Sequence, residues 1–311
     1  MKYVKNGKYE LSLFQLGTVQ LGMNYGIIGE NEKPSAEYAY SMLDRAIELG
    51  VNSLDTANNY ADSERVIGEW LRRTPREKWP AIITKIGPFK HEDKDALRRD
   101  IRSEVRECLQ TLGVDSIDIL MLHNFSDYAA SPDIIMEEFR RFKDEGIAKT
   151  IAISVYSYED YFAVAKSGFE AVQLPINIFD QARIIDGGLK AIADAGMMIF
   201  ARSVFLQGLV FIDPDELDPR MKFAEEPLRR FRALCEEFGM EPSTLAASFV
   251  LSLPGITSLV LGCQRIPQIE ENAKMLDKAR ILTDEEMKRI KVAFEKIDER
   301  VINPKLWYNK W

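Results

Sequence analysis

Short runs of apolar residues alternate along the chain with longer segments in which apolar residues recur at every third or fourth position. The short runs, such as residues 81–86, are typical of buried strands, and the longer segments, such as residues 97–112, are typical of helices with one apolar face. Glycine often separates a helix from the next strand, as at Gly50 and Gly113, which suits a helix C-terminus. The eight predicted strands are residues 13–16, 51–54, 81–86, 117–122, 149–154, 170–174, 197–203 and 257–261.

The predicted strands are apolar on both faces, so both faces must be covered by other elements, which indicates a parallel sheet. Eight strand and helix units in about 250 residues predict a closed (β/α)8 TIM barrel of the α/β class. A doubly wound open sheet is the alternative, but no Gly-x-Gly-x-x-Gly motif follows the first strand. No linker or shift of composition divides the chain, so we expect residues 1–311 to form a single domain.

Several segments lie outside the minimal barrel. Residues 3–11 predict a β-hairpin that turns at Asn6-Gly7, and residues 17–29, which are rich in glycine, predict a loop before a helix that Ser35 caps. Residues 205–226, which are rich in Asp and Pro, are predicted to form a long loop that serves a ligand or acts as a lid. The pattern from Thr283 to Glu286 is that of a capping box and predicts a helix through Ile297. The aromatic tail, residues 303–311, is expected to dock on the protein.

Composition narrows the classes of function. The net charge is −8, and no segment concentrates Lys and Arg among aromatic residues, so nucleic acid is not expected as a partner. No apolar run approaches the roughly 18 residues that span a bilayer, and no signal peptide is apparent, so we expect a cytoplasmic protein without a membrane segment. Three dispersed cysteines and two histidines make disulfides or a metal site unexpected.

Polar residues follow several predicted strands, and a barrel would bring them to one mouth, where barrel active sites lie. Asp55 ends the second strand, Tyr60 stands in the turn after it, Lys85 ends the third strand, and His123 ends the fourth. A lysine in an apolar strand needs a carboxylate partner, so we predict that Asp55 pairs with Lys85. Each residue has a structural alternative, such as a satisfied core histidine, but four on consecutive strands favour a catalytic site.

These motifs together resemble the aldo-keto reductase family, of the bacterial type, over nearly the full chain. The resemblance implies a TIM barrel with an N-terminal β-hairpin and extra C-terminal helices. The matching segments are Asp55-Thr-Ala-Asn-Asn-Tyr60-Ala-Asp-Ser63-Glu64, Thr84-Lys85, Leu122-His123-Asn124, Val172-Gln173-Leu-Pro-Ile-Asn177 and Gln268-Ile-Glu-Glu271-Asn272.

The resemblance implies an NAD(P)(H)-dependent oxidoreductase that interconverts a carbonyl, in an aldehyde, ketone or sugar, and an alcohol by hydride transfer. Tyr60 would be the general acid and base, and Lys85 would ease the loss of the phenolic proton. Asp55 would hold Lys85 in place, and His123 would orient the carbonyl by a hydrogen bond.

The resemblance also implies a nicotinamide cofactor, with NADP(H) as first choice and NAD(H) as a real possibility, because Arg265 is the one basic residue available for a 2′-phosphate. Two positions depart from the family pattern: Val155 follows Ser154 where asparagine is usual, and Arg202 stands where an aromatic residue commonly stacks on the nicotinamide. The expected cofactor contacts are Thr18, Gln20, Asp55, Ser154, Gln173, Arg202, Ser203, Phe205, Gln207, Gly208, Gly262, Gln264, Arg265, Gln268, Glu271 and Asn272.

Two other functions stay open at this point. One is a nicotinamide-cofactor-binding sensor or accessory subunit with little turnover, since a fold does not determine a function. The other takes Lys85 as the Schiff-base lysine of a barrel aldolase. The expected substrate is a small carbonyl compound or sugar, and monomer and oligomer are both compatible with the sequence.

Overall fold

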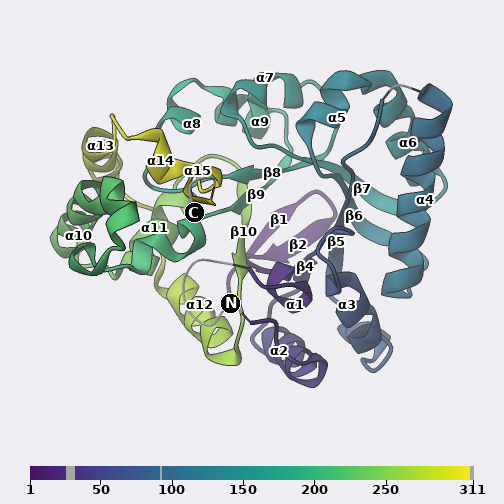
Figure 1. Cartoon of the computed structure of the whole chain (residues 1–311), viewed down its shortest axis with the longest axis horizontal. Helices are drawn as coiled ribbons and strands as arrows, with labels where there is room; N and C mark the ends of the chain where they lie inside the picture. The colour runs from purple at the N-terminus through teal and green to yellow at the C-terminus, as the bar shows by residue number, and fades with distance from the viewer. Residues whose placement is uncertain (26–31, 92, 309–311) are drawn as a thin grey trace.

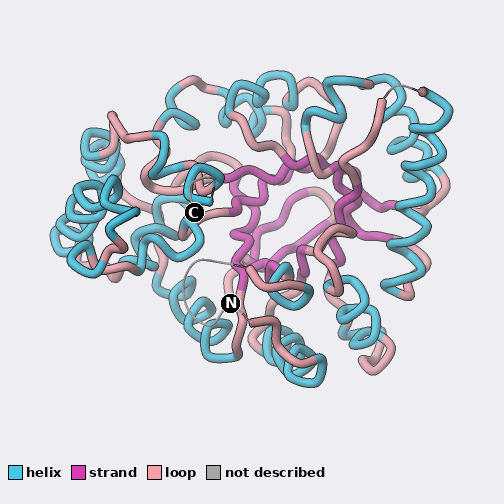
Figure 2. Tube along the Cα trace, in the orientation of Figure 1, coloured by secondary structure: helices cyan, strands magenta, loops and turns pink. Residues whose placement is uncertain are grey.

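Eight parallel strands form a closed barrel in the order β10-β3-β4-β5-β6-β7-β8-β9, and β10 also pairs with β9 to complete the ring. The computed structural model describes residues 1–25, 32–91 and 93–308. Figures 1 and 2 show the strands as an inner ring surrounded by helices. The (β/α)8 barrel is therefore confirmed. The strands are β3 (Phe14–Gly17), β4 (Ser53–Asp55), β5 (Ala81–Ile86), β6 (Ile117–Leu122), β7 (Ala148–Ser154), β8 (Ala171–Pro175), β9 (Met198–Arg202) and β10 (Ile256–Gly262).

Each barrel strand buries both of its faces, as the apolar runs predicted. In β6, Ile119 and Met121 belong to a cluster inside the barrel, whereas Leu120 and Leu122 belong to the larger cluster that the strands share with the helices. Successive side chains of a strand point to opposite faces, so one apolar run supplies both cores. This double burial is why the strands carry so few polar residues except near their carboxyl ends.

The helices cover the outside of the barrel and begin and end at identifiable residues. Ser35 caps α2, as predicted, by accepting a hydrogen bond from the Tyr38 N–H, and α4 ends at Gly113, which has a left-handed φ of 70°. The helices are α1 (Val19–Gly22), α2 (Ala36–Glu48), α3 (Ser63–Leu71), α4 (Lys94–Leu112), α5 (Phe125–Ala130), α6 (Pro132–Asp144), α7 (Tyr161–Val164), α8 (Ala182–Ile185), α9 (Gly188–Asp194), α10 (Glu225–Phe238), α11 (Pro242–Leu251), α12 (Ile266–Lys278), α13 (Asp284–Ala293), α14 (Glu299–Ile302) and α15 (Lys305–Tyr308).

An N-terminal hairpin of β1 (Tyr3–Asn6) and β2 (Tyr9–Ser12) packs against the barrel interior through Leu11, which belongs to the inner cluster. The hairpin is confirmed, but its turn lies one residue later than predicted, because Asn6 pairs with Tyr9 inside the ladder. Gly7, with a φ of 59°, therefore opens the turn. The hairpin leaves the other end of the barrel, formed by the carboxyl ends of the strands, for a site.

Two predicted loops differ from their predicted form. Within the predicted loop of residues 17–29, Val19–Gly22 is the short helix α1, and residues 26–31 lie outside the described residues. Residues 205–226 are not one irregular loop but three 3₁₀ helices, η3 (Leu206–Phe211), η4 (Pro214–Glu216) and η5 (Pro219–Ala224), and α10 begins at Glu225. Other short 3₁₀ helices are η1 (Arg76–Lys78) and η2 (Tyr158–Asp160).

The C-terminal part of the chain forms three helices, of which α13 contacts α10 and α14 contacts η5. The capping box at Thr283 and Glu286 is present, but α13 ends at Ala293 and not at Ile297, because Phe294 leaves the helical conformation. Trp307 is buried, and its indole N–H donates to the Arg300 carbonyl oxygen, so the described part of the tail docks as predicted. Residues 309–311 lie outside the described residues. Among the described helices, none has both the length and the hydropathy needed to cross a bilayer.

Candidate active site

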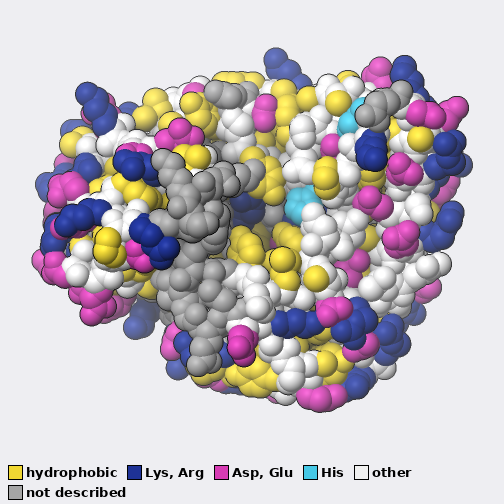
Figure 3. All heavy atoms as spheres, viewed as in Figure 1, with side chains coloured by type: hydrophobic (Ala, Val, Ile, Leu, Met, Phe, Trp, Pro, Cys, Tyr) yellow, Lys and Arg dark blue, Asp and Glu magenta, His cyan; other side chains and the backbone are white. Residues whose placement is uncertain are grey.

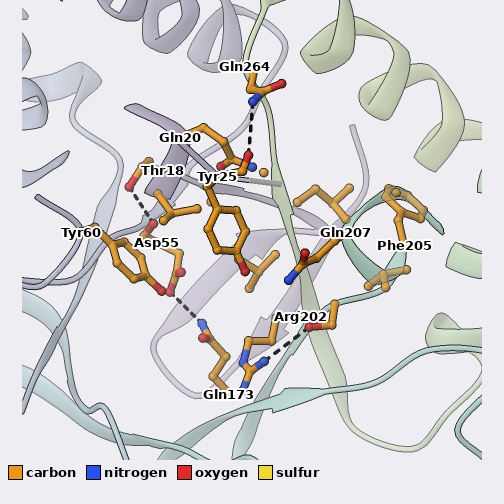
Figure 4. A pocket seen from close by; sticks show the side chains of 18 of the residues that line it. Thr18, Gln20, Tyr25, Asp55, Tyr60, Gln173, Arg202, Phe205, Gln207 and Gln264 are labelled. Carbon is orange, nitrogen blue, oxygen red and sulfur yellow. Dashed lines mark hydrogen bonds between the residues drawn. The ribbon is translucent and has the colours of Figure 1, made fainter. Parts of the chain in front are cut away.

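The carboxyl ends of the strands surround a pocket of about 340 Å³. Figure 3 shows a hollow near the centre of this face, and Figure 4 shows that the side chains of its walls point inward from several strands and loops. The pocket is lined by Gly17, Thr18, Val19, Gln20, Tyr25, Asp55, Tyr60, His123, Tyr156, Gln173, Arg202, Ser203, Val204, Phe205, Gln207, Gly208, Phe211, Val260, Leu261, Gly262, Gln264 and Gln268.

A buried ion pair lies at the base of the pocket. The Lys85 ammonium donates to Asp55 Oδ2 at 2.8 Å and to the Thr56 carbonyl oxygen at 2.9 Å, and the Lys85 side chain is fully buried. Gln173 donates its amide N–H to the other oxygen of Asp55 at 2.7 Å. The sequence predicted the pairing of Lys85 with Asp55 but not the contact with Gln173. Asp55 thus links β4 to the neighbouring β5 and, across the barrel mouth, to β8.

Burial and charge act in opposite directions on Lys85. Burial lowers the pKa of Lys85, and the Asp55 carboxylate opposes that shift through its charge and its hydrogen bond. A lone ammonium at this depth would lose its proton, so Asp55 is what keeps a positive charge under the pocket. The lysine carries no exposed surface, which disfavours the Schiff-base alternative, because a carbonyl substrate cannot reach its amine.

Tyr60 lies directly above this pair. Its hydroxyl oxygen is 3.5 Å from the Lys85 Nζ, which also lies 4.9 Å from the centre of the phenol ring. Burial raises the pKa of Tyr60 well above its ordinary value, and the Asp55 charge raises it further. The phenol is therefore protonated at neutral pH, which suits a proton donor. The sequence led us to expect that Lys85 eases the loss of the phenolic proton; the net shift of the Tyr60 pKa is nevertheless upward, because burial and the Asp55 charge outweigh the nearby ammonium.

His123 stands beside Tyr60 at the end of β6. The two rings are 5.9 Å apart at an interplanar angle of 77°. Burial, and then the charges of Lys85 and Arg202, lower the pKa of His123 to about 3, so the imidazole is neutral. Among the described residues, none bonds to its buried Nδ1. A neutral imidazole and a protonated phenol at one wall can both hydrogen-bond a small polar group in the pocket.

The predicted cofactor residues divide into two groups. Most of them line the pocket: Asp55 ends β4, Gln173 lies in β8, and the others lie at the ends of β3, β9 and β10 or in the segments that follow these strands. Ser154 lies buried beneath the surface, and its hydroxyl oxygen is without a partner among the described residues. Arg265 is exposed at the start of α12, Glu271 is exposed along that helix, and Asn272 donates to Cys263 Sγ at 3.3 Å. Arg265, Glu271 and Asn272 are thus placed near the pocket's edge but not in its walls.

The backbone beside the pocket is strained. Four described non-glycine residues have positive φ, and all four are next to the pocket: Ala61 follows Tyr60, and Ser203, Leu206 and Gln207 follow β9. Such conformations cost on the order of 1–3 kcal/mol each and cluster at functional sites. The segment after β9 is therefore held in an unusual shape, and its cost is consistent with a binding role.

Sequence reasoning missed three aromatic residues of the pocket. Tyr25, Tyr156 and Phe211 all line it and are 38–49% exposed. Tyr156 packs under the Arg202 guanidinium, with 4.2 Å between the ring centre and Cζ. Each lies in a predicted loop that the sequence does not place. The one sequence signal that could have identified them is a large aromatic side chain in a loop that follows a barrel strand.

Removing Lys85 should strongly destabilise the protein. In Lys85→Met, Asp55 would keep the Gln173 donor but lose its counter-charge, which costs about 3–5 kcal/mol of the free energy of unfolding. The double variant Lys85→Met/Asp55→Asn removes both charges and should be more stable than Lys85→Met alone. Urea denaturation of the wild type, both single variants and the double variant measures the cycle. A double variant as unstable as the sum of the single variants would contradict the coupling.

His123 should make the protein sensitive to mild acid. Its pKa of about 3 in the folded state lies below the unfolded value of about 6.5, so the unfolded chain binds the extra proton between these values. The contribution of the neutral His123 to the free energy of unfolding is therefore fully present above about pH 6.5, and it is lost as the pH falls toward 3. Between pH 7 and pH 5 the wild type should lose about 2 kcal/mol more than His123→Asn, measured by urea denaturation. Equal losses would contradict a neutral, buried His123.

Comparison with known proteins agrees with this geometry. The model of the Aldo/keto reductase family matches residues 14–295. An oxidoreductase of Bacillus subtilis (strain 168), YqkF, named as uncharacterized, is 27% identical over 302 residues, which cover 91% of this chain and 95% of that protein. The NADH-specific methylglyoxal reductase of Escherichia coli (strain K12) is 24% identical over 315 residues, with 89% and 94% covered.

Among solved structures, the holo form of the aldo-keto reductase AKR11C1 from Bacillus halodurans is similar in fold. Its TM-score is 0.76 at 22% sequence identity, and the alignment covers 97% of this chain and 100% of that chain. The family match runs from the first barrel strand through α13, far beyond half of the sequence. This chain therefore belongs to the Aldo/keto reductase family and is an oxidoreductase.

Proposed function

We propose that this protein interconverts a small carbonyl compound and the corresponding alcohol with a nicotinamide cofactor, and that Tyr60 is its general acid and base. The observation that carries this proposal is the Tyr60 hydroxyl 3.5 Å from the ammonium of the buried Lys85–Asp55 pair, with the His123 ring at the same wall. These groups can give a proton to a carbonyl oxygen and stabilise the charge that develops there.

Each residue of this group has one role in the proposal. Tyr60 donates its proton from Oη to the carbonyl oxygen during reduction and recovers it during oxidation. The Nζ of Lys85, 3.5 Å from Tyr60 Oη, stabilises the phenolate by its charge. Asp55 positions Lys85 and keeps it charged, and it does not touch the substrate in this account. His123 donates or accepts a hydrogen bond that fixes the carbonyl relative to Tyr60, with its proton on whichever nitrogen the ligand requires.

The pocket also fits an amide-bearing cofactor. Gln20 Oε1 in the pocket wall, and Ser154 Oγ buried at the end of β7 outside that wall, are buried and without a hydrogen-bond partner among the described residues. Buried polar groups are rarely left unpaired, so these atoms suit a ligand with both donors and acceptors, such as a carboxamide. A bound nicotinamide supplies the hydride, and the residues of the chain bind and orient it. The remainder of the cofactor would lie along two further parts of the pocket wall. These are the segment from Ser203 to Gly208 and the residues Gly262, Gln264 and Gln268.

The choice of cofactor in this proposal is NADP(H) first and NAD(H) second. Arg265, exposed at the N-terminus of α12, offers a positive charge to a 2′-phosphate just outside the pocket wall. Gln264 and Gln268, which line the pocket beside it, are neutral and would suit a ribose hydroxyl instead. The Escherichia coli relative is named NADH-specific, and NAD(H) is therefore the second choice of cofactor in this proposal.

Tyr60→Phe should abolish turnover without preventing cofactor binding. Loss of the proton donor should lower kcat by about 10² to 10⁴-fold, because the phenyl ring fills the same space but has no proton to give. The measurement is oxidation of NADPH or NADH with a panel of aliphatic and aromatic aldehydes, ketones and aldoses. Fluorescence titration gives the affinity for each nucleotide in parallel. Tyr128→Phe, which removes a hydroxyl of α5 that is not among the described lining residues of the pocket, is the matched control and should behave as wild type.

Three results would count against this function. Turnover that survives in Tyr60→Phe would remove Tyr60 from the chemistry. Tight nucleotide binding with no turnover of any panel member by the wild type would favour the sensor or accessory subunit. Failure of the wild type to bind either nucleotide would overturn the proposal as a whole.

A further inference from the structure

The charges around the pocket do not balance. Among the described lining residues, two side chains are charged, those of Asp55 and Arg202. The imidazole of His123, which also lines the pocket, is neutral. The charge of Asp55 is already matched by Lys85 beneath it. No described carboxylate forms an ion pair with Arg202, whose hydrogen bonds go to neutral oxygen atoms. The pocket thus carries a net positive charge, and that charge belongs to Arg202.

The Arg202 guanidinium is held in place before any ligand arrives. It stacks on Tyr156, with Cζ 4.2 Å from the ring centre, and it donates to the Val155 carbonyl oxygen at 3.3 Å and to Ser203 Oγ at 3.4 Å. A guanidinium has five N–H donors, and its planar fork matches the two oxygens of a carboxylate or phosphate. These contacts use two donors, so the others remain for a ligand in the pocket.

The location of the guanidinium places its charge near the proposed proton donor. Val155 and Tyr156, two of its three contacts, lie after β7, whereas Arg202 ends β9 and Ser203 follows it, so the side chain reaches past the end of β8 toward the segment after β7. The charge of Arg202 adds to burial and to Lys85 in lowering the pKa of His123. The cation therefore acts at the end of the pocket where Tyr60 and His123 stand.

We propose that Arg202 recognises an anionic group of the substrate, so that the preferred carbonyl compounds carry a carboxylate or a phosphate. This inference rests on the proposed reductase function of the same pocket. A fixed cation without a protein counter-ion favours anionic ligands over neutral ones, and it adds geometry when two oxygens meet the fork. The same charge also steers anionic substrates into the mouth of a protein whose net charge is −8.

A phosphate of the cofactor is the other source of the same chemistry, so the test must separate the two. The substrate pair is 4-carboxybenzaldehyde and its neutral methyl ester, which differ in charge at the same position of one ring. We compare kcat/KM for both aldehydes in the wild type, Arg202→Gln and Arg202→Lys, and we measure NADPH and NADH affinity by fluorescence. Arg289→Gln, which removes an exposed arginine on α13, is the control and should match the wild type.

The ratio of kcat/KM for the acid to that for the ester should fall about ten- to hundredfold in Arg202→Gln, the effect of losing a charged hydrogen-bonded contact. Arg202→Lys should retain part of the preference, and the ratio should fall whether or not nucleotide affinity changes, because both aldehydes react with the same bound nucleotide. A ratio that stays the same in Arg202→Gln overturns the proposal. Equal losses for both aldehydes with weaker nucleotide binding would assign the guanidinium to a cofactor phosphate and also overturn it.

A measurement without turnover separates this proposal from the reductase function. Calorimetric titration of the wild type with benzoate, and with benzamide as the neutral match, detects the anion site directly. Benzoate should bind in preference to benzamide, and Arg202→Gln should lose that preference. Equal binding of the two by the wild type would sink the anion site whatever the enzyme turns over, whereas selective benzoate binding without any turnover would leave the anion site standing and count against the reductase.

Discussion

The buried ion pair between Lys85 and Asp55 is the interaction on which the mouth of the barrel depends. Isolated charges at this depth are too costly to persist, so each keeps the other ionised. Because Asp55 also accepts a hydrogen bond from Gln173 across the mouth, one carboxylate fixes the relative positions of three strands. The pair therefore determines both the geometry and the electrostatics of the space in which Tyr60 stands.

The two ends of the barrel therefore differ in composition and in role. The interior apolar cluster and the hairpin fill the amino-terminal end, which leaves only the carboxyl ends of the strands for polar chemistry. Short strands and strained loops meet there, and the positive-φ residues after Tyr60 and after β9 show where the backbone departs from relaxed geometry. The stability of the fold thus comes from the apolar layers. The charged groups, the unpaired polar atoms and the strained backbone are located at the mouth.

Much of this arrangement could be predicted from the sequence, for physical reasons. The strands were recognisable because double burial leaves them almost wholly apolar, and the partner of Lys85 was predictable because a buried cation needs a counter-charge. The contact of Gln173 with Asp55 was not predictable, since it joins strands on opposite sides of the ring. Tyr25 and Tyr156 were missed because loop conformation decides which exposed aromatic residue reaches a pocket, and local sequence does not encode that conformation.

We infer that a bound nicotinamide cofactor gives a hydride to a carbonyl carbon in this mouth, while Tyr60 supplies the proton to the carbonyl oxygen. The most direct measurement follows the hydrogen atom itself, by mass spectrometry of the alcohol formed from NADPH or NADH that carries deuterium on the transferred face of C4. We expect one deuterium on the carbinol carbon. An alcohol that carries no deuterium at carbon would contradict direct hydride transfer, and with it the role assigned to the whole site.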